Sequence, residues 1–173
     1  EVMDLKKAMF QKLDQFAPSH AVLASNTSGL SITEMASVTR RPEKTIIIHG
    51  VNPPHIIPIV EIVRGEKTSD ETADLAYRLM KKVGKVPVRV LKEVPGFLYN
   101  RLQFALYREA IHCLETGVAT AEDIDLVVKG GYGFRSANLG PLETSDFGGL
   151  DTFLRITQNL YPKLNDAKEA PAI

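Results

Sequence analysis

The sequence predicts an α/β segment followed by an all-α segment. Helix-like and strand-like patterns alternate over the first 91 residues, which is typical of helices packed against a mostly parallel sheet. After the run Lys-Glu-Val-Pro-Gly at 92–96 no strand pattern recurs, and only helical spacing remains. We therefore expect two domains, over residues 1–93 and 94–173.

Helices in the first segment are predicted from apolar spacing and from capping residues. Pro18 ends the first helix, because proline breaks a helix interior. Ser31 with Glu34 resembles a capping box at the start of the second. Residues 68–71, Thr-Ser-Asp-Glu, supply cap candidates and early acids for the third. The expected helices cover residues 3–16, 32–38 and 70–83.

Four apolar runs predict the strands of this segment. Pro87, within the last run, favours an edge strand or a strand start. The second run delivers His49 to its end, and the third delivers Glu61. Because α/β proteins keep their chemistry at strand ends, this histidine and carboxylate predict a general base with an orienting partner. The expected strands cover residues 21–24, 45–48, 56–60 and 86–91.

The second segment reads as helices throughout. Apolar side chains on one stripe predict a long helix over 97–116, and another follows over 121–129. We expect Gly130-Gly131 to end that second helix. The run up to Gly133 resembles a phosphate loop only superficially, since it does not join a strand to a helix. Residues 140–160 are also expected to be largely helical.

Composition excludes several classes of function. The 21 basic and 21 acidic residues balance, and no Lys/Arg cluster is long enough for a nucleic-acid footprint. The single cysteine, Cys113, excludes a disulfide framework and a thiolate metal site, and it fits a reducing cytoplasm. No apolar stretch approaches the roughly 18 residues that span a bilayer. We therefore expect no nucleic-acid partner and no membrane insertion.

The remaining histidines are weaker candidates for chemistry. His55 follows His49 by six residues, but no third ligand is evident, so we expect no metal site. His20 precedes a predicted strand and His112 lies within a predicted helix, where both are expected to be structural.

Five short motifs stand in order along nearly the whole chain: Asn26-Thr27-Ser28, His49-x-x-Asn52-Pro53, Glu61, Pro95-Gly96-Phe97-x-x-Asn100-Arg101 and Leu139-Gly140-Pro141-Leu142-Glu143. Together they resemble the L-3-hydroxyacyl-CoA dehydrogenase family. The resemblance implies that residues 1–93 are the rear portion of a Rossmann-type NAD-binding domain and that 94–173 form its helical dimerisation and substrate domain. The family's Gly-x-Gly-x-x-Gly loop is not in this sequence, so we expect a fragment that binds NAD weakly by itself.

The resemblance also implies a reaction, the oxidation of the 3-hydroxyl of a 3-hydroxyacyl-CoA to a ketone with NAD. His49 would be the base, since an unperturbed imidazole has a pKa of about 6.5. Glu61 would hold the other ring nitrogen and stabilise the imidazolium. Ser28 and Asn100 would hydrogen-bond the substrate oxygen.

Further positions are assigned by the same resemblance. Lys6 and Glu1 would lie beside the cofactor, Asn52 would lie near its nicotinamide, and Ser28 would also bind the cofactor. The acyl-CoA thioester would lie along a cleft between the domains, with Arg135 a candidate for a CoA phosphate. The helical domain would form a homodimer.

Two departures leave the substrate open. Gly50-Val51 stands where acyl-CoA members of the family often have aromatic residues, and Pro54-His55 also differs. The Pro-Pro pair is similar to that of gulonate dehydrogenases and lambda-crystallins. The alternatives are therefore a dehydrogenase of a free hydroxy acid such as gulonate, or a non-catalytic dimerisation module.

Overall fold

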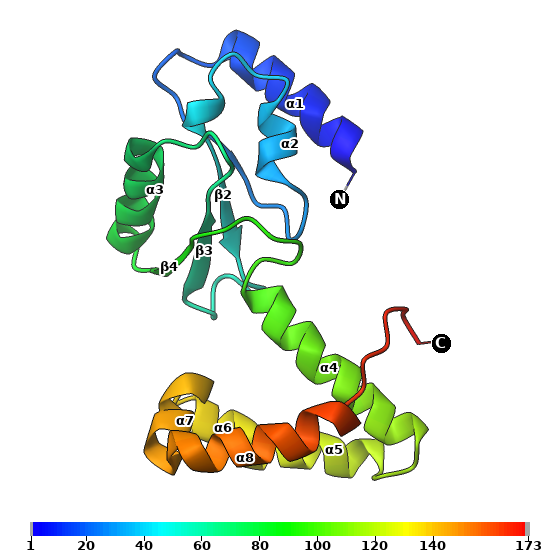
Figure 1. Cartoon of the computed structure of the whole chain (residues 1–173). Coiled ribbons are helices and arrows are strands. Elements are labelled where there is room, and N and C mark those ends of the chain that lie inside the picture. The colour runs from blue at the N-terminus through cyan, green and yellow to red at the C-terminus, as the bar shows by residue number, and fades with distance from the viewer. Residues whose placement is uncertain (1, 172–173) are drawn as a thin grey trace. The chain divides into compact units, whose positions relative to one another are not determined.

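The computed structural model describes residues 2–171 and divides into two compact units, Glu1–Leu102 and Gln103–Ile173. The first unit is an α/β layer structure and the second is helical (Figure 1). The predicted order, α/β and then all-α, is therefore confirmed. The expected domain boundary between residues 93 and 94 stays a prediction.

The first unit contains a four-stranded mixed sheet in the order β1-β2-β3-β4. β1 pairs with β2 and β3 with β4 in parallel, whereas β2 and β3 are antiparallel. A short turn joins β2 to β3 without a crossover helix, and only antiparallel neighbours allow that. Pro87 lies on the edge strand, as predicted. The strands are β1 Leu23–Ser25, β2 Thr45–Gly50, β3 Ile59–Val63 and β4 Val86–Val90.

The helices of this unit begin at the predicted caps. The Ser31 hydroxyl accepts a hydrogen bond from the Glu34 amide, and the Ser69 hydroxyl accepts one from the Thr72 amide. Each cap satisfies a backbone donor that has no partner within its helix. The helices are α1 Met3–Phe16, α2 Ile32–Ala36, the 3-10 helix η1 Pro42–Lys44 and α3 Asp70–Lys82.

Helices cover both faces of the sheet, so the two central strands, β2 and β3, are buried on two sides. On one face α1 and α2 pack Phe10 and Met35 against Ile47. On the other face α3 packs Ala73 against Ile46. Neighbouring residues of β2 therefore face opposite cores, as the alternation along a strand requires. This explains its continuous run of apolar residues before His49.

The second unit consists of helices, and one predicted helix end is wrong. Gly130-Gly131 does not end a helix, because a π-helical turn, η2, carries the chain onward into α6. A β-carbon on Gly133 would approach the Val128 carbonyl oxygen to 2.7 Å, so glycine permits this wider turn. The elements are α4 Tyr99–Glu115, α5 Ala121–Val127, η2 Val128–Gly133, α6 Phe134–Ser136, α7 Pro141–Gly148, α8 Leu150–Leu160 and the 3-10 helix η3 Tyr161–Lys163.

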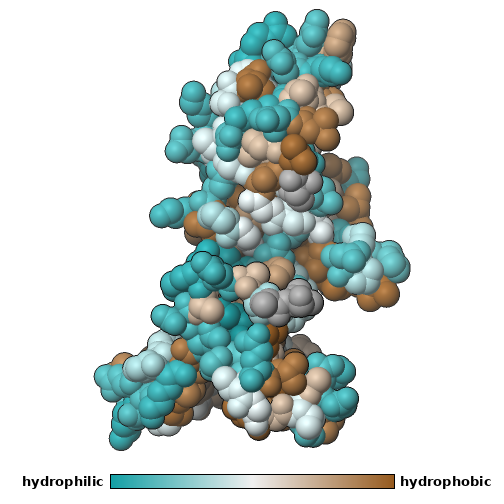
Figure 2. Space-filling model, turned by 90° about the vertical axis from the view of Figure 1, so that its right-hand side faces the viewer, coloured by the Kyte–Doolittle hydropathy of each residue, from teal (hydrophilic) through white to brown (hydrophobic). Residues whose placement is uncertain are grey.

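The helical unit has apolar side chains but no buried core of its own. Among the described residues from 103 to 171, no side chain is buried. Brown, hydrophobic side chains lie on its surface between polar ones (Figure 2). None of the helices formed by the described residues is long and apolar enough to cross a membrane. The large exposed apolar residues include Phe104, Leu126, Phe134, Phe147, Leu150 and Leu154.

Candidate active site

His49 and Glu61 meet across the antiparallel pair at the centre of the sheet. The register of β2 and β3 places the two residues directly opposite each other. His49 Nδ1 lies 2.7 Å from Glu61 Oε2. The expected hydrogen bond between these two side chains is therefore present.

Glu61 does not stand at a strand end, and the strand expected over 56–60 is wrong. β3 begins at Ile59 and has Glu61 as its middle residue. The amides of Ile56 and Ile57 both donate to the Pro53 carbonyl, which holds the preceding residues in a turn. An apolar run alone does not distinguish turn residues from strand residues here.

Glu61 is almost fully buried and needs its hydrogen-bond donors. Glu61 is 1% exposed, and His49 is 4% exposed. Oε2 accepts from His49, while Oε1 accepts from the amides of Leu98 and Tyr99 at 2.9 and 2.8 Å. Burial by itself would raise the pKa of Glu61, but the hydrogen bonds from His49 and these two amides outweigh it and lower the pKa. Glu61 is therefore a carboxylate at neutral pH.

The state of Glu61 determines which nitrogen of His49 is basic. An ionised carboxylate only accepts hydrogen bonds, so Nδ1 of His49 carries the hydrogen and donates it. In the neutral ring the lone pair available for a proton is then on Nε2. The pair can therefore act as a general base with a fixed tautomer.

Asn100 and Ser28 are also brought together. Asn100 is the second residue of α4, and its Nδ2 donates to the backbone oxygen of Ser28 at 2.9 Å. The same helix start supplies the amide of Tyr99 to Glu61. Two residues expected to bind the substrate oxygen thus lie next to each other, at the helix start that holds Glu61.

Two residues near this pair have no assigned role in the sequence-based prediction. Asn26 Oδ1 accepts from the amide of Gly50 at 2.9 Å, so the loop after β1 is tied to the end of β2. The Phe97 ring packs edge-on against His49, with centroids 5.5 Å apart. Asn26 was detectable as a polar residue directly after a strand. Phe97 carried no polar signal.

Lys6, Asn52 and Glu1 are residues that we expected to lie beside the cofactor. Lys6 lies near the start of α1 and is half-buried, and Asn52 is exposed in the turn after β2. Within the described part of the chain, no hydrogen bond joins either of them to His49 or Glu61. Glu1 lies outside the described residues.

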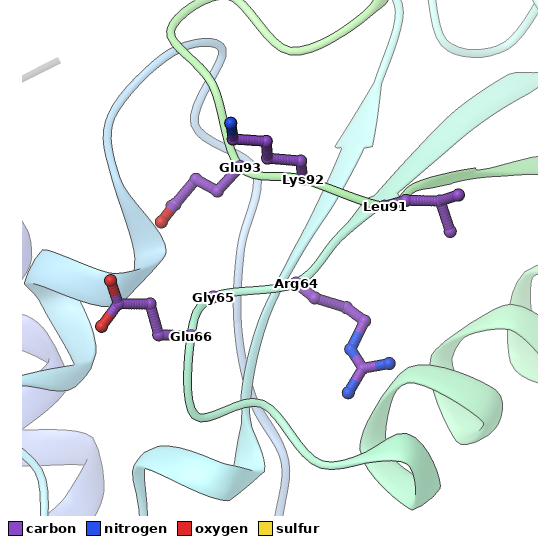
Figure 3. A pocket seen from close by; sticks show the side chains of 6 residues that line it. All are labelled: Arg64, Gly65, Glu66, Leu91, Lys92 and Glu93. Carbon is purple, nitrogen blue, oxygen red and sulfur yellow. The ribbon is translucent and has the colours of Figure 1, made fainter.

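A cavity of about 440 Å³ lies beyond the carboxyl ends of β3 and β4, away from the predicted site residues. The carboxylates of Glu66 and Glu93 lie on one side of it, while Arg64 points to the other (Figure 3). Glu93 accepts hydrogen bonds from the Ile32 amide and from Thr33 Oγ1, both at 2.5 Å, so its contacts hold the start of α2. No metal-binding group of three or more side chains occurs among the described residues.

Comparisons with known proteins define the class of this molecule. Residues 1–94 match the model of the 3-hydroxyacyl-CoA dehydrogenase NAD binding domain. Residues 96–173 match the C-terminal domain of the same enzymes. The two models describe domains of one class of dehydrogenase, and the first of these domains is named for binding NAD. The chain is a member of the 3-hydroxyacyl-CoA dehydrogenase family.

Individual relatives carry different names. A probable 3-hydroxybutyryl-CoA dehydrogenase of Bacillus subtilis is 45% identical over 99% of this chain and 58% of its own length. The lambda-crystallin of Oryctolagus cuniculus is 43% identical over 83% of this chain and 45% of its own length. This chain therefore spans about half the length of the curated relatives it matches.

A solved structure is similar over nearly all of this chain. It is a 5-formyl-3-hydroxy-2-methylpyridine 4-carboxylic acid 5-dehydrogenase, described as an NAD+ dependent dismutase. It superposes with a TM-score of 0.95 at 36% identity, covering 99% of this chain and 55% of the other. The family thus includes an enzyme named for a carboxylic acid that is not a CoA thioester.

Proposed function

We propose that the protein containing this chain oxidises the 3-hydroxyl of a 3-hydroxyacyl-CoA to a ketone with NAD, and that His49 is the general base. The buried hydrogen bond between His49 and Glu61 carries the proposal. It supplies a basic nitrogen with a fixed tautomer next to a carboxylate that is held ionised. The relatives named as 3-hydroxybutyryl-CoA dehydrogenases support the same chemistry.

The residues of this chain have distinct tasks in that reaction. NAD, when bound, would accept the hydride from the substrate. Nε2 of His49 takes the proton of the substrate hydroxyl, so the ring becomes positively charged. Glu61 then stabilises the imidazolium through the hydrogen bond that already orients it. No proton needs to move onto Glu61, since its pKa is lowered.

Asn100 and Ser28 are suited to bind the substrate oxygen. One Nδ2 hydrogen of Asn100 is used on the Ser28 carbonyl, which leaves the other for a ligand. A donor fixed in this way can polarise a forming carbonyl. Exposed hydroxyl and amide groups on Ser28 and Asn52 also match the donors and acceptors of a nicotinamide carboxamide. They follow β1 and β2, at the carboxyl ends of two parallel strands, where cofactors bind in such sheets.

The test of the base is a steady-state assay of the full-length protein carrying His49→Gln. We expect kcat to fall by about 10²- to 10⁴-fold, which is the usual contribution of a positioned general base. The matched control is His55→Gln, since His55 is exposed in the turn after β2. An equal loss in both variants, or none in His49→Gln, would show that His49 is not the base.

A free hydroxy acid is the second candidate substrate. The pyridine carboxylic acid dehydrogenase with the TM-score of 0.95 favours it. A β-carbon built on Gly50 would lie 3.8 Å from its nearest neighbour, the Asn26 side chain. Glycine therefore leaves space at this position that a larger side chain would fill. Assays with 3-hydroxybutyryl-CoA, free 3-hydroxybutyrate and gulonate separate the two candidates by their kcat/KM values. Activity on none of them would instead favour the non-catalytic module.

The helical unit is proposed to form a homodimer. Its described residues include no buried side chain, yet many large apolar ones are exposed, as on α8. Apolar surface of that extent is typical of an interface between subunits. Sedimentation velocity of the full-length protein should therefore give twice the mass of one chain. A single-chain mass at about 10 μM would contradict the dimer, because obligate interfaces remain intact far below that concentration.

A further inference from the structure

We propose that Phe97 is a positioning residue for His49, a role that rests on the proposed function of His49 as the base. The hydrogen bond to Glu61 restrains one nitrogen of the imidazole, but the ring can still turn about that bond. The Phe97 ring packs against the imidazole at an interplanar angle of 66° and blocks this rotation. Together the two contacts fix the direction in which Nε2 points.

The backbone of Phe97 supports this assignment. Its φ is +50°, and within the described chain it is the one residue other than glycine with a positive φ. Bulky side chains rarely adopt this left-handed conformation, because it costs free energy. Gly96 before it has a φ of +76°, so two successive residues turn the chain sharply.

This turn brings two parts of the segment onto the same pair of side chains. The ring of Phe97 contacts His49, while the amides of Leu98 and Tyr99 donate to Glu61. An extended residue at position 97 would direct the following amides elsewhere. The unfavourable backbone conformation of Phe97 thus belongs to one arrangement, in which the segment 97–99 contacts both His49 and Glu61.

The alternative is that Phe97 only fills the core. It is 1% exposed and belongs to the same hydrophobic cluster as Phe10, which is 2% exposed on α1. Phe10 makes no ring contact with His49 among the described residues, so it shares the packing role without the contact. Phe10→Leu is therefore the matched control for Phe97→Leu.

The experiment compares these two variants in the full-length protein. We expect Phe97→Leu to lower kcat by about tenfold with little change in KM, since a misdirected base slows proton transfer without weakening binding. In proton NMR, the downfield Nδ1 hydrogen of His49 should broaden in this variant. Phe10→Leu should lower Tm by a similar amount but leave both kcat and the Nδ1 signal close to wild type.

Two results would overturn the proposal. One is a Phe97→Leu variant with wild-type kcat and an unchanged Nδ1 signal, and the other is an equal loss of kcat in Phe10→Leu. If Phe97→Leu does not fold, Phe97→Met is measured instead, because methionine fills more of the space. The NMR comparison needs no substrate, so it decides the role of Phe97 even if the wild-type protein oxidises none of the compounds tested.

Discussion

Glu61 links His49, the proposed base, to the start of α4. Its two carboxylate oxygens accept from three donors, one on the imidazole of His49 and two on the backbone of Leu98 and Tyr99. These bonds satisfy a charge that burial alone would make very costly. Substitution of Glu61 should therefore affect both the tautomer of His49 and the stability of the fold.

Glu61→Gln is expected to change how stability depends on pH. The pKa of Glu61 in the fold is below its ordinary value of 4.5, so the carboxylate stabilises the fold above that pH. This contribution is lost as the pH falls through the folded-state pKa. The free energy of unfolding should therefore fall less steeply in Glu61→Gln than in wild type as the pH is lowered below 4.5.

Urea titrations at several pH values measure this difference. Glu66→Gln is the control, because Glu66 is exposed and lies in the loop after β3. It should keep the wild-type slope. Identical slopes for wild type and Glu61→Gln would mean that the buried carboxylate makes no net contribution to stability in acid.

The residues of the site were predictable to different degrees. His49 and Glu61 follow apolar runs, and a histidine with a carboxylate is a common combination of a general base with its orienting partner. The direct pairing of the two residues depends on the antiparallel register of β2 and β3, which no local pattern specifies. The contact of Phe97 with His49 was not predictable, because it depends on a left-handed turn and on the folding together of residues far apart in the sequence. The catalytic roles themselves stay predictions.

At the scale of elements, the end of α1 is held by a buried arginine. Arg41 donates through Nε to Asp14 Oδ1 at 2.9 Å and through Nη2 to the Ala17 carbonyl at 3.0 Å. The last carbonyls of a helix have no partner within it, so a cation here satisfies them. The backbone amide of Arg40 lowers the pKa of Asp14 against the opposing effect of burial, and the side chains of Arg40 and Arg41 add to it.

Arg41→Lys should destabilise the protein more than Arg40→Lys does. The Arg41 side chain is 11% exposed and the Arg40 side chain 80%, although both contact Asp14. Lysine cannot reproduce the divergent donors of a guanidinium. We expect the fall in Tm for Arg41→Lys to be roughly twice that for Arg40→Lys or more, since exposed ion pairs contribute little. Thermal unfolding followed by circular dichroism measures both. Equal shifts would contradict the argument.

Most elements were predictable because their signals are local. Caps such as Ser31 and Ser69 act on amides three residues away, and they begin their helices where expected. The errors lie where the signal is not local. The run over 56–60 mixes turn and strand residues, and η2 continues through glycines that ordinarily end a helix.

At the scale of the whole molecule, the 173 residues should bind NAD weakly by themselves. They contain no Gly-x-Gly-x-x-Gly sequence, which supplies the backbone amides for the pyrophosphate in dinucleotide-binding folds. Calorimetry with residues 1–173 should give a dissociation constant above about 100 μM, whereas the full-length protein should bind more tightly. Micromolar affinity of residues 1–173 would contradict this expectation.

Glu61 is hydrogen-bonded to backbone amides at positions 98 and 99, and this affects how the sequence at these positions can vary. Every amino acid except proline offers the same amide, so substitutions at positions 98 and 99 can leave both hydrogen bonds to Glu61 in place. Chimeras that exchange the residues from position 98 onward between relatives should therefore keep both hydrogen bonds of Glu61, provided that neither position 98 nor position 99 becomes proline. The pairing of His49 with Glu61 would then stay constant while the residues that follow it change.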